Sequence, residues 1–238
     1  MAAANLKLVS LRELGLRRHV ERALLTTGVS EVDGLIEGFP RGAISEIVGE
    51  TGSGRTSLVL VVLAAATSRG EVCAYIDVHG SFDPMAAAVD GAELNKLIWV
   101  RCGGDYCAAL KSIGEILSAG GFGTVVLDLG GVARKDLRKI PSSYWYRFRL
   151  AIEHTETILL LLGKEPSARN CAELQLKVRP VRRQWAHRRA SSHTTGLFRG
   201  LSFELLLAKS QVSRSLTVKG TAGSDENTVV ITARPRMV

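Results

Sequence analysis

The residues from Gly49 to Thr56 have the composition and spacing of a phosphate-binding loop. They match the pattern GxxxxGK followed by Ser or Thr at every fixed position except the lysine, which is Arg55 here. In such a loop, backbone N–H groups converge on phosphate oxygens and the hydroxyl helps to hold Mg²⁺, so ATP and Mg²⁺ are the cofactors to which it points. The candidate nucleotide-binding residues are Gly49, Glu50, Thr51, Gly52, Ser53, Gly54, Arg55, Thr56 and Ser57. The alternative is an ordinary glycine turn between a strand and a helix.

Arg55 is the departure from this pattern. Arginine keeps the positive charge, but its planar fork on a longer stem does not reproduce the compact ammonium group of lysine at the β- and γ-phosphates. We therefore expect nucleotide binding to survive this replacement and hydrolysis to suffer.

Asp128 is the second candidate metal residue, together with Thr56. It ends the apolar run Val125–Leu127, where a protein with a phosphate-binding loop places a magnesium-associated carboxylate. An aspartate after an apolar strand is also a common helix cap or turn residue. The loop upstream favours the magnesium interpretation.

The elements around these residues alternate between strands and helices, which predicts an α/β fold with a mainly parallel central sheet flanked by helices. We expect about five parallel strands, at Ala43–Val48, Val72–Asp77, Leu97–Val100, Thr124–Leu129 and Thr157–Leu162. Helices are expected at Ser57–Thr67, Pro84–Val89, Tyr106–Ala119 and Ser142–His154. Shorter strands at Ala172–Arg179, Leu201–Ala208, Ser215–Lys219 and Thr228–Thr232 read as an antiparallel C-terminal extension. An amphipathic pattern over residues 5–25 predicts an N-terminal helical segment (residues 1–25), followed by the main domain (residues 26–238).

Composition sets the broad class of the protein. The 238 residues are 46% hydrophobic and 23% charged, which is typical of a folded globular chain. No apolar run approaches the 18 or so residues of a membrane-spanning helix, and no secretory signal pattern is visible at Met1. We therefore expect a cytoplasmic protein without a membrane partner.

The net charge of +8 is concentrated near the C-terminus. Ten Lys and Arg residues lie between Lys177 and Lys219, against the single acid Glu204, so the extension at about 177–238 is basic. Such a segment attracts polyanions, and DNA is the first candidate; a solvated face or an acidic protein partner is the alternative. Within it, Trp185 can stack on a base or pack on the core. The candidate DNA-binding residues are Arg182, Arg183, Trp185, Arg188 and Arg189, and residues 130–146 form a second candidate, with an amphipathic helix as the alternative.

Two stretches make the chain resemble the RecA recombinase family: residues 27–49, which lead into the phosphate-binding loop, and residues 74–84, with their Asp-Pro pair. The likeness covers about residues 25–165. Where the family carries the glutamate that polarises the attacking water, this chain has His79, and the glutamine expected after Leu162 is replaced by the sequence from Gly163 to Pro166. The resemblance thus implies a RecA-like scaffold that has lost efficient ATP hydrolysis. We assign no catalytic residue and expect at most a weak ATPase.

The short chain, the altered loop and the basic tail are most similar to ImuA-type proteins; the tail segments are Arg182–Trp185 and Leu197–Leu201. That resemblance implies an adaptor in SOS-induced, error-prone translesion DNA synthesis. The implied partners are DNA, an error-prone DNA polymerase, its Y-family-like accessory subunit and RecA, with oligomerisation possible. The alternatives are an active DNA-dependent RecA-family ATPase and an SOS cell-division inhibitor, and DNA binding would distinguish the adaptor from the inhibitor.

Overall fold

The computed structural model describes residues 22–186, 197–210 and 228–233, and the side chains of residues 22–181 and 203–210. One eight-stranded sheet dominates this part of the chain, in the order β10-β9-β8-β3-β7-β6-β4-β5. Its strands are β3 (Ala43–Val48), β4 (Val72–Asp77), β5 (Leu97–Arg101), β6 (Phe122–Asp128), β7 (Ile158–Gly163), β8 (Ala172–Ala186), β9 (Leu197–Ser210) and β10 (Thr228–Ala233). Six neighbouring strands pair in parallel, in the order β8, β3, β7, β6, β4 and β5. β9 pairs antiparallel with β8, and β10 pairs antiparallel with β9. The predicted mainly parallel α/β fold is confirmed.

Helices cover both faces of the sheet. They are α1 (Ser30–Ile36), α2 (Arg55–Ser68), α3 (Pro84–Val89), α4 (Tyr106–Ala119), α5 (Arg134–Leu137) and α6 (Ser142–Ile152), with short 3-10 turns at Leu94–Lys96 and Arg169–Cys171. Side chains of α1, α2 and α3 enter one hydrophobic core, and those of α4 and α6 enter the other. Strand residues alternate between the two cores: Tyr75 belongs to the first, and its neighbours Ala74 and Ile76 belong to the second. Among the described residues, no helix is long and apolar enough to cross a bilayer.

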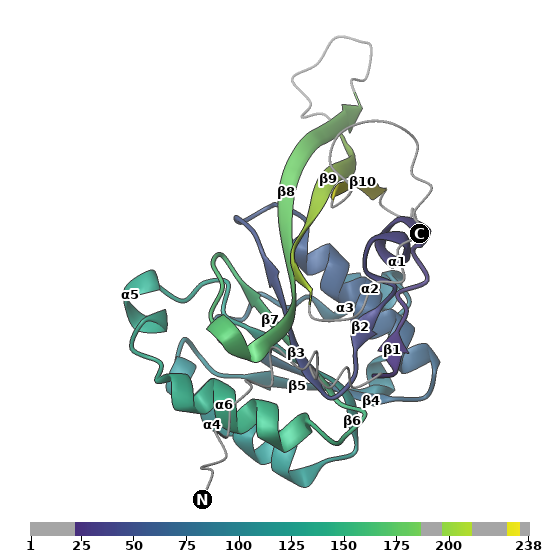
Figure 1. Ribbon diagram of the computed structural model, residues 1–238. Coiled ribbons are helices and arrows are strands. Elements are labelled where there is room, and N and C mark those ends of the chain that lie inside the picture. Colours follow the sequence, from purple (N-terminus) through teal and green to yellow (C-terminus); the bar gives the residue numbers. More distant parts are fainter. Residues whose placement is uncertain (1–21, 187–196, 211–227, 234–238) are drawn as a thin grey trace, which may run out of the picture.

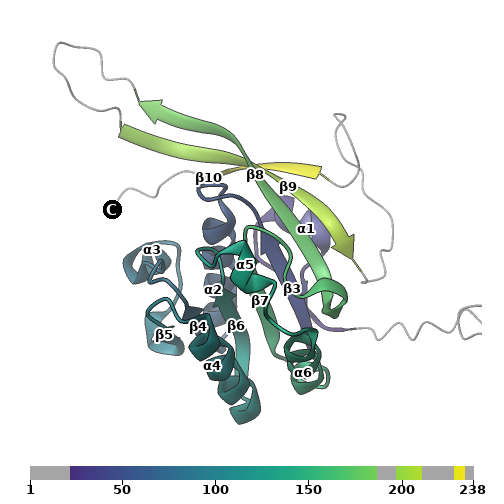
Figure 2. The ribbon, with the colours of Figure 1, turned by 90° about the vertical axis from the view of Figure 1, so that its left-hand side faces the viewer.

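The strand beginning at Ala172 differs from its prediction. It pairs in parallel with β3 before continuing as an antiparallel hairpin with β9, which extends beyond the body of the sheet (Figure 1 and Figure 2). A parallel crossover normally needs a dozen or more residues, but residues 164–171 make this one. The buried carboxylate of Glu46 fixes the short connection by accepting hydrogen bonds from the N–H groups of Ser167 (2.6 Å) and Ala168 (2.7 Å).

Most of the predicted N-terminal helical segment, residues 1–21, lies outside the described residues. At its end the structure differs from the prediction, because Leu24–Leu25 form the short strand β1, which pairs with β2 (Phe39–Pro40). This pairing places Leu25 in the core at 1% exposure. The strand expected at Ser215–Lys219 also lies outside the described residues.

Candidate nucleotide-binding site

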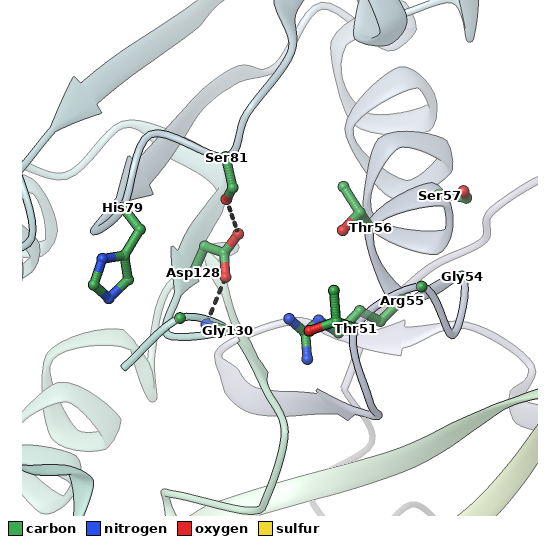
Figure 3. Close-up of a pocket in the computed structure, with 11 residues that line it drawn as sticks. Thr51, Gly54, Arg55, Thr56, Ser57, His79, Ser81, Asp128 and Gly130 are labelled. Atoms are coloured by element: carbon green, nitrogen blue, oxygen red, sulfur yellow. Dashed lines mark hydrogen bonds between the residues drawn. The ribbon is translucent and has the colours of Figure 1, made fainter. Parts of the chain in front are cut away.

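The phosphate-binding loop from Gly49 to Thr56 leads from β3 into the first turn of α2 at the carboxyl end of the parallel strands (Figure 3). Gly52 and Gly54 have φ values of +76° and +98°, a region in which side chains are disfavoured. Gly54 caps α2, and its carbonyl accepts the first helical hydrogen bond from Leu58 at 3.1 Å. The glycines therefore let the chain turn sharply and leave the N–H groups of the helix terminus open toward an anion.

Gly49 lies where the loop passes β8. A Cβ at this position would stand 2.5 Å from the carbonyl oxygen of Val178 and 2.6 Å from Ser53 Oγ, so a side chain has no room. Ser53 Oγ is buried and has no hydrogen-bond partner within the described part of the chain. A buried hydroxyl left without a partner is unfavourable, and an oxygen-rich ligand in the loop would be a partner of suitable chemistry.

Arg55 is the buried cation of the loop, with 9% of its surface exposed. Its Nη1 donates a hydrogen bond to the carbonyl of Gly49, so the side chain folds back into the loop. The second terminal nitrogen of the same guanidinium, Nη2, lies against Gly130, where an added Cβ would stand 2.2 Å from it. The arginine thus connects the phosphate-binding loop to the segment that follows β6.

A cavity of about 360 Å³ opens between this loop and the ends of β4 and β6. Thr56 lies on the side of α2 that faces Asp128, and His79 lies beyond Asp128 on the far side (Figure 3). The lining residues are Thr51, Gly52, Gly54, Arg55, Thr56, Ser57, His79, Ser81, Asp128, Gly130 and Gly131. The structure therefore brings both predicted metal residues to one cavity.

Asp128 is held by three donors and is 6% exposed. Its Oδ2 accepts hydrogen bonds from Tyr75 Oη at 2.9 Å and Ser81 Oγ at 2.8 Å. Its Oδ1 accepts one from the N–H of Gly130 at 2.7 Å. Burial and the nearby Asp128 carboxylate raise the pKa of Tyr75 well above its usual range, so the tyrosine remains a donor.

Asp77, at the end of β4, organises the next loop rather than the cavity. Its carboxylate accepts hydrogen bonds from the N–H groups of Gly80 (2.7 Å), Ser81 (3.0 Å) and Phe82 (2.9 Å), and from Trp99 Nε1 (3.3 Å). Burial by itself would raise the pKa of Asp77, but these donors lower it below its ordinary value. The ionised carboxylate fixes the loop that carries Ser81 into the site.

The donor set of the cavity fits a nucleotide phosphate with Mg²⁺. The loop offers backbone N–H groups and the Arg55 cation to phosphate, and Thr56 and Asp128 offer the hydroxyl and carboxylate that Mg²⁺ accepts. Among the described residues, no group of three or more His, Cys, Asp or Glu side chains could hold a metal by itself. Magnesium would therefore need ligands from phosphate and water.

Several predicted residues lie away from this cavity, while others were missed. Gly49, Glu50 and Ser53 belong to the loop but not to the cavity wall. Ser81, Gly130 and Gly131 line the wall and were not predicted as nucleotide-binding residues. The position of Ser81 just after the carboxyl end of β4 was the available signal, because ligands of α/β proteins bind at that edge of the sheet.

The candidate DNA-binding residues are described only in part. Arg182, Arg183 and Trp185 lie on the β8 arm of the hairpin, opposite Ser202, Leu201 and Phe198 of β9, while Arg188 and Arg189 lie outside the described residues. On the same strand, nearer the phosphate-binding loop, Lys177 and Arg179 are exposed.

The second candidate, residues 130–146, divides into a basic part and an aromatic part. Trp145 is 2% exposed and packs in the core against Phe148, which matches the amphipathic-helix alternative for the aromatic part. The basic side chains at and beside α5 are exposed: Arg134, Lys135, Arg138 and Lys139.

The parallel sheet, the glycine loop before α2 and the aspartate at the end of β6 together define an α/β protein with a phosphate-binding loop. The model of the RecA N-terminal domain family matches residues 7–135, more than half of the chain. The chain belongs to this family.

Curated relatives and a solved structure are also similar to parts or all of this fold. The chain is 33% identical to Protein RecA of Rickettsia massiliae over 121 residues, which is 50% of this chain and 35% of that protein. It is 38% identical to Protein RecA of Rickettsia africae over 91 residues, 37% of this chain and 26% of that protein. The matches thus span about a third or less of these relatives. The crystal structure of the RadB recombinase is similar in fold, with a TM-score of 0.61 and 15% identity over 89% of this chain and 96% of that one.

Proposed function

We propose that this chain is a DNA-repair accessory protein of the RecA family, which binds ATP with Mg²⁺ in the loop 49–57 and hydrolyses it poorly. The finer part of the proposal is an ImuA-like role as adaptor in error-prone translesion DNA synthesis, beside an error-prone DNA polymerase and its Y-family-like subunit.

The proposal of weak hydrolysis rests on the hydrogen bonding of Asp128. Within the described wall of the cavity it is the one carboxylate, and three hydrogen bonds leave it one acceptor site, which bound Mg²⁺ would take. A base that orients water needs a free acceptor within hydrogen-bond reach. Bound Mg²⁺ would neutralise charge on the phosphates, and the residues that would hold it are Thr56 and Asp128. The chain's own groups therefore support binding better than water activation.

His79 is the observation that favours the second candidate, an active DNA-dependent ATPase. Its imidazole lies in the cavity wall and packs against Gly131, where a Cβ would stand 2.3 Å from His79 Cδ2. Histidine is a common general base, so turnover through His79 would be the chemical route for an active enzyme.

The decisive experiment measures binding and turnover separately. A fluorescent ATP analogue reports binding to the full chain with Mg²⁺, and phosphate release reports turnover with and without single-stranded DNA. The proposal expects Mg²⁺-dependent binding and little release under both conditions. DNA-stimulated release that His79→Ala removes would favour the ATPase instead.

The adaptor role needs its own test. Immobilised chain should retain the error-prone polymerase and the Y-family-like subunit of the same organism. A variant with Arg182, Arg183, Arg188 and Arg189 replaced by alanine should retain these proteins and lose DNA. Failure of the unaltered chain to retain either protein would contradict the adaptor role without affecting nucleotide binding.

A further inference from the structure

Ser81 connects two carboxylates at the ends of neighbouring strands. Asp77 and Asp128 are register partners in β4 and β6. Ser81 donates its N–H to Asp77 Oδ1 at 3.0 Å and its hydroxyl to Asp128 Oδ2 at 2.8 Å, while Asp77 Oδ1 lies 3.5 Å from the same hydroxyl. A serine hydroxyl has one proton, so it can donate only one full hydrogen bond, and the shorter distance assigns that bond to Asp128.

The remaining capacity of Asp128 follows from counting its acceptor sites. Each carboxylate oxygen has about two lone-pair sites. Both sites of Oδ2 are used, by Tyr75 and Ser81, and one site of Oδ1 is used by Gly130. The free site is therefore on Oδ1, and the three hydrogen bonds fix the plane of the carboxylate.

We propose that Ser81 is a positioning residue that orients Asp128 so that Oδ1 faces the Mg²⁺ of a bound nucleotide. The inference rests on the proposed nucleotide-binding function. Mg²⁺ requires near-ideal octahedral geometry, so a carboxylate free to rotate contributes less to its binding. Removal of such an outer partner typically weakens metal affinity about 10–100-fold.

Ser81 is a better probe of this arrangement than Tyr75. Tyr75 is buried and its ring packs on Phe82 with a centroid distance of 4.4 Å, so its replacement also affects the core. Ser81 is exposed in the cavity wall, so removal of its hydroxyl creates no buried void. Ser112 is a matched control, since its hydroxyl bonds to the Ala108 carbonyl within α4 and it does not line the cavity.

The test titrates Mg²⁺ into full-length protein with a fixed concentration of a fluorescent ATP analogue, and repeats the binding measurement in excess EDTA. Ser81→Ala should raise the Mg²⁺ midpoint about tenfold and leave the affinity in EDTA within about twofold. Ser81→Thr should restore the midpoint, and Ser112→Ala should not change it. If Ser81→Ala does not fold, Tyr75→Phe removes the other Oδ2 donor and should shift the midpoint in the same direction.

Two results would overturn the inference alone: an unchanged Mg²⁺ midpoint in Ser81→Ala, or an equal loss of affinity with and without Mg²⁺. The first would show that Asp128 needs no help, and the second would show a merely structural role. Absence of Mg²⁺-dependent binding in the unaltered protein would instead overturn the proposed function, and this inference with it.

Discussion

The guanidinium of Arg55 occupies the space that a side chain at residue 130 would need, since a Cβ on Gly130 would stand 2.2 Å from Arg55 Nη2 and 2.9 Å from Asp128 Oδ1. The phosphate-binding loop and the segment after β6 are thus packed against each other through a position where glycine fits. Arg55 has consequently become part of the structure of the loop as well as a potential phosphate ligand.

Gly130→Ala should therefore destabilise the protein, by about 1–3 kcal/mol, because Arg55 or Asp128 must move to admit the methyl group. In an Arg55→Ala background the same change should cost about 1 kcal/mol less. Urea unfolding of the four proteins in the double-mutant cycle measures both values. Gly114→Ala is the control, because nothing lies within 4 Å of its added Cβ in α4 and a gain of about 0.5–1 kcal/mol is expected. Additive effects of the two substitutions would show that Arg55 and Gly130 do not interact.

Substitutions of Arg55 should separate nucleotide binding from DNA binding. Arg55→Ala should lower affinity for the ATP analogue at least about tenfold, since one hydrogen bond to a charged group contributes about 1.5–3 kcal/mol. It should leave affinity for single-stranded DNA largely intact. Arg55→Lys should retain nucleotide binding through its compact charge. Fluorescence anisotropy with labelled nucleotide and labelled DNA measures both, and parallel loss of the two affinities in Arg55→Ala would contradict the separation.

The basic hairpin can be tested by the salt dependence of DNA binding. Replacing Arg182, Arg183, Arg188 and Arg189 together should weaken binding to single-stranded DNA. The slope of log affinity against log salt should become shallower by roughly 2–3, because each phosphate contact contributes about 0.7 to its magnitude. Lys111→Ala, an exposed change on α4, is the control. An unchanged slope would instead assign DNA binding to the exposed residues Lys135, in α5, and Arg138, directly after it.

Much of this arrangement was predictable because its chemistry is local in the sequence. The spacing of Gly49, Gly52 and Gly54 alone indicates the phosphate-binding loop, and the apolar run before Asp128 indicates a strand end at the same edge of the sheet. The contacts of Tyr75 and Ser81 with Asp128 depend instead on the register between β4 and β6, which no local pattern encodes.

The direction of β8 could not be predicted for a related reason. Residues 164–171 carry neither the length nor the helical pattern of a usual parallel crossover. The polar side chain of Glu46, inside an apolar strand, fixes that crossover across more than 120 residues of sequence. Its role becomes visible once β3 and the connection lie side by side.

Asp77 should make stability depend on pH in the acid range. Its pKa in the folded protein is below the ordinary value of 3.8, so the unfolded chain binds the proton more readily. Its contribution is present in full above about pH 4 and is lost as pH falls through the lower, folded-state pKa. Asp77→Asn should be destabilised at pH 7, and its difference from the unaltered protein should narrow below pH 4. Urea unfolding at several pH values measures this, and a constant difference down to the acid limit would refute the assignment.

Glu46 should be the buried carboxylate on which the parallel pairing of β8 depends. It is 1% exposed, its Oε1 accepts the N–H groups of Ser167 and Ala168, and its Oε2 accepts Gln175 Nε2 at 2.9 Å. Glu46→Gln can keep these contacts if the Gln175 amide turns over, so it should cost only the charge assistance, about 1–2 kcal/mol.

Glu46→Ala should cost more, because it leaves two N–H donors near Ser167 without a partner at about 1–3 kcal/mol each. Glu115→Gln, on the exposed face of α4, should change stability by less than about 0.5 kcal/mol. Hydrogen exchange should show the loss of protection in the β3–β8 ladder before the β6–β7 ladder, because Glu46 anchors the connection that leads into β8. Equal loss in both ladders would show that Glu46 stabilises the whole domain and not this crossover.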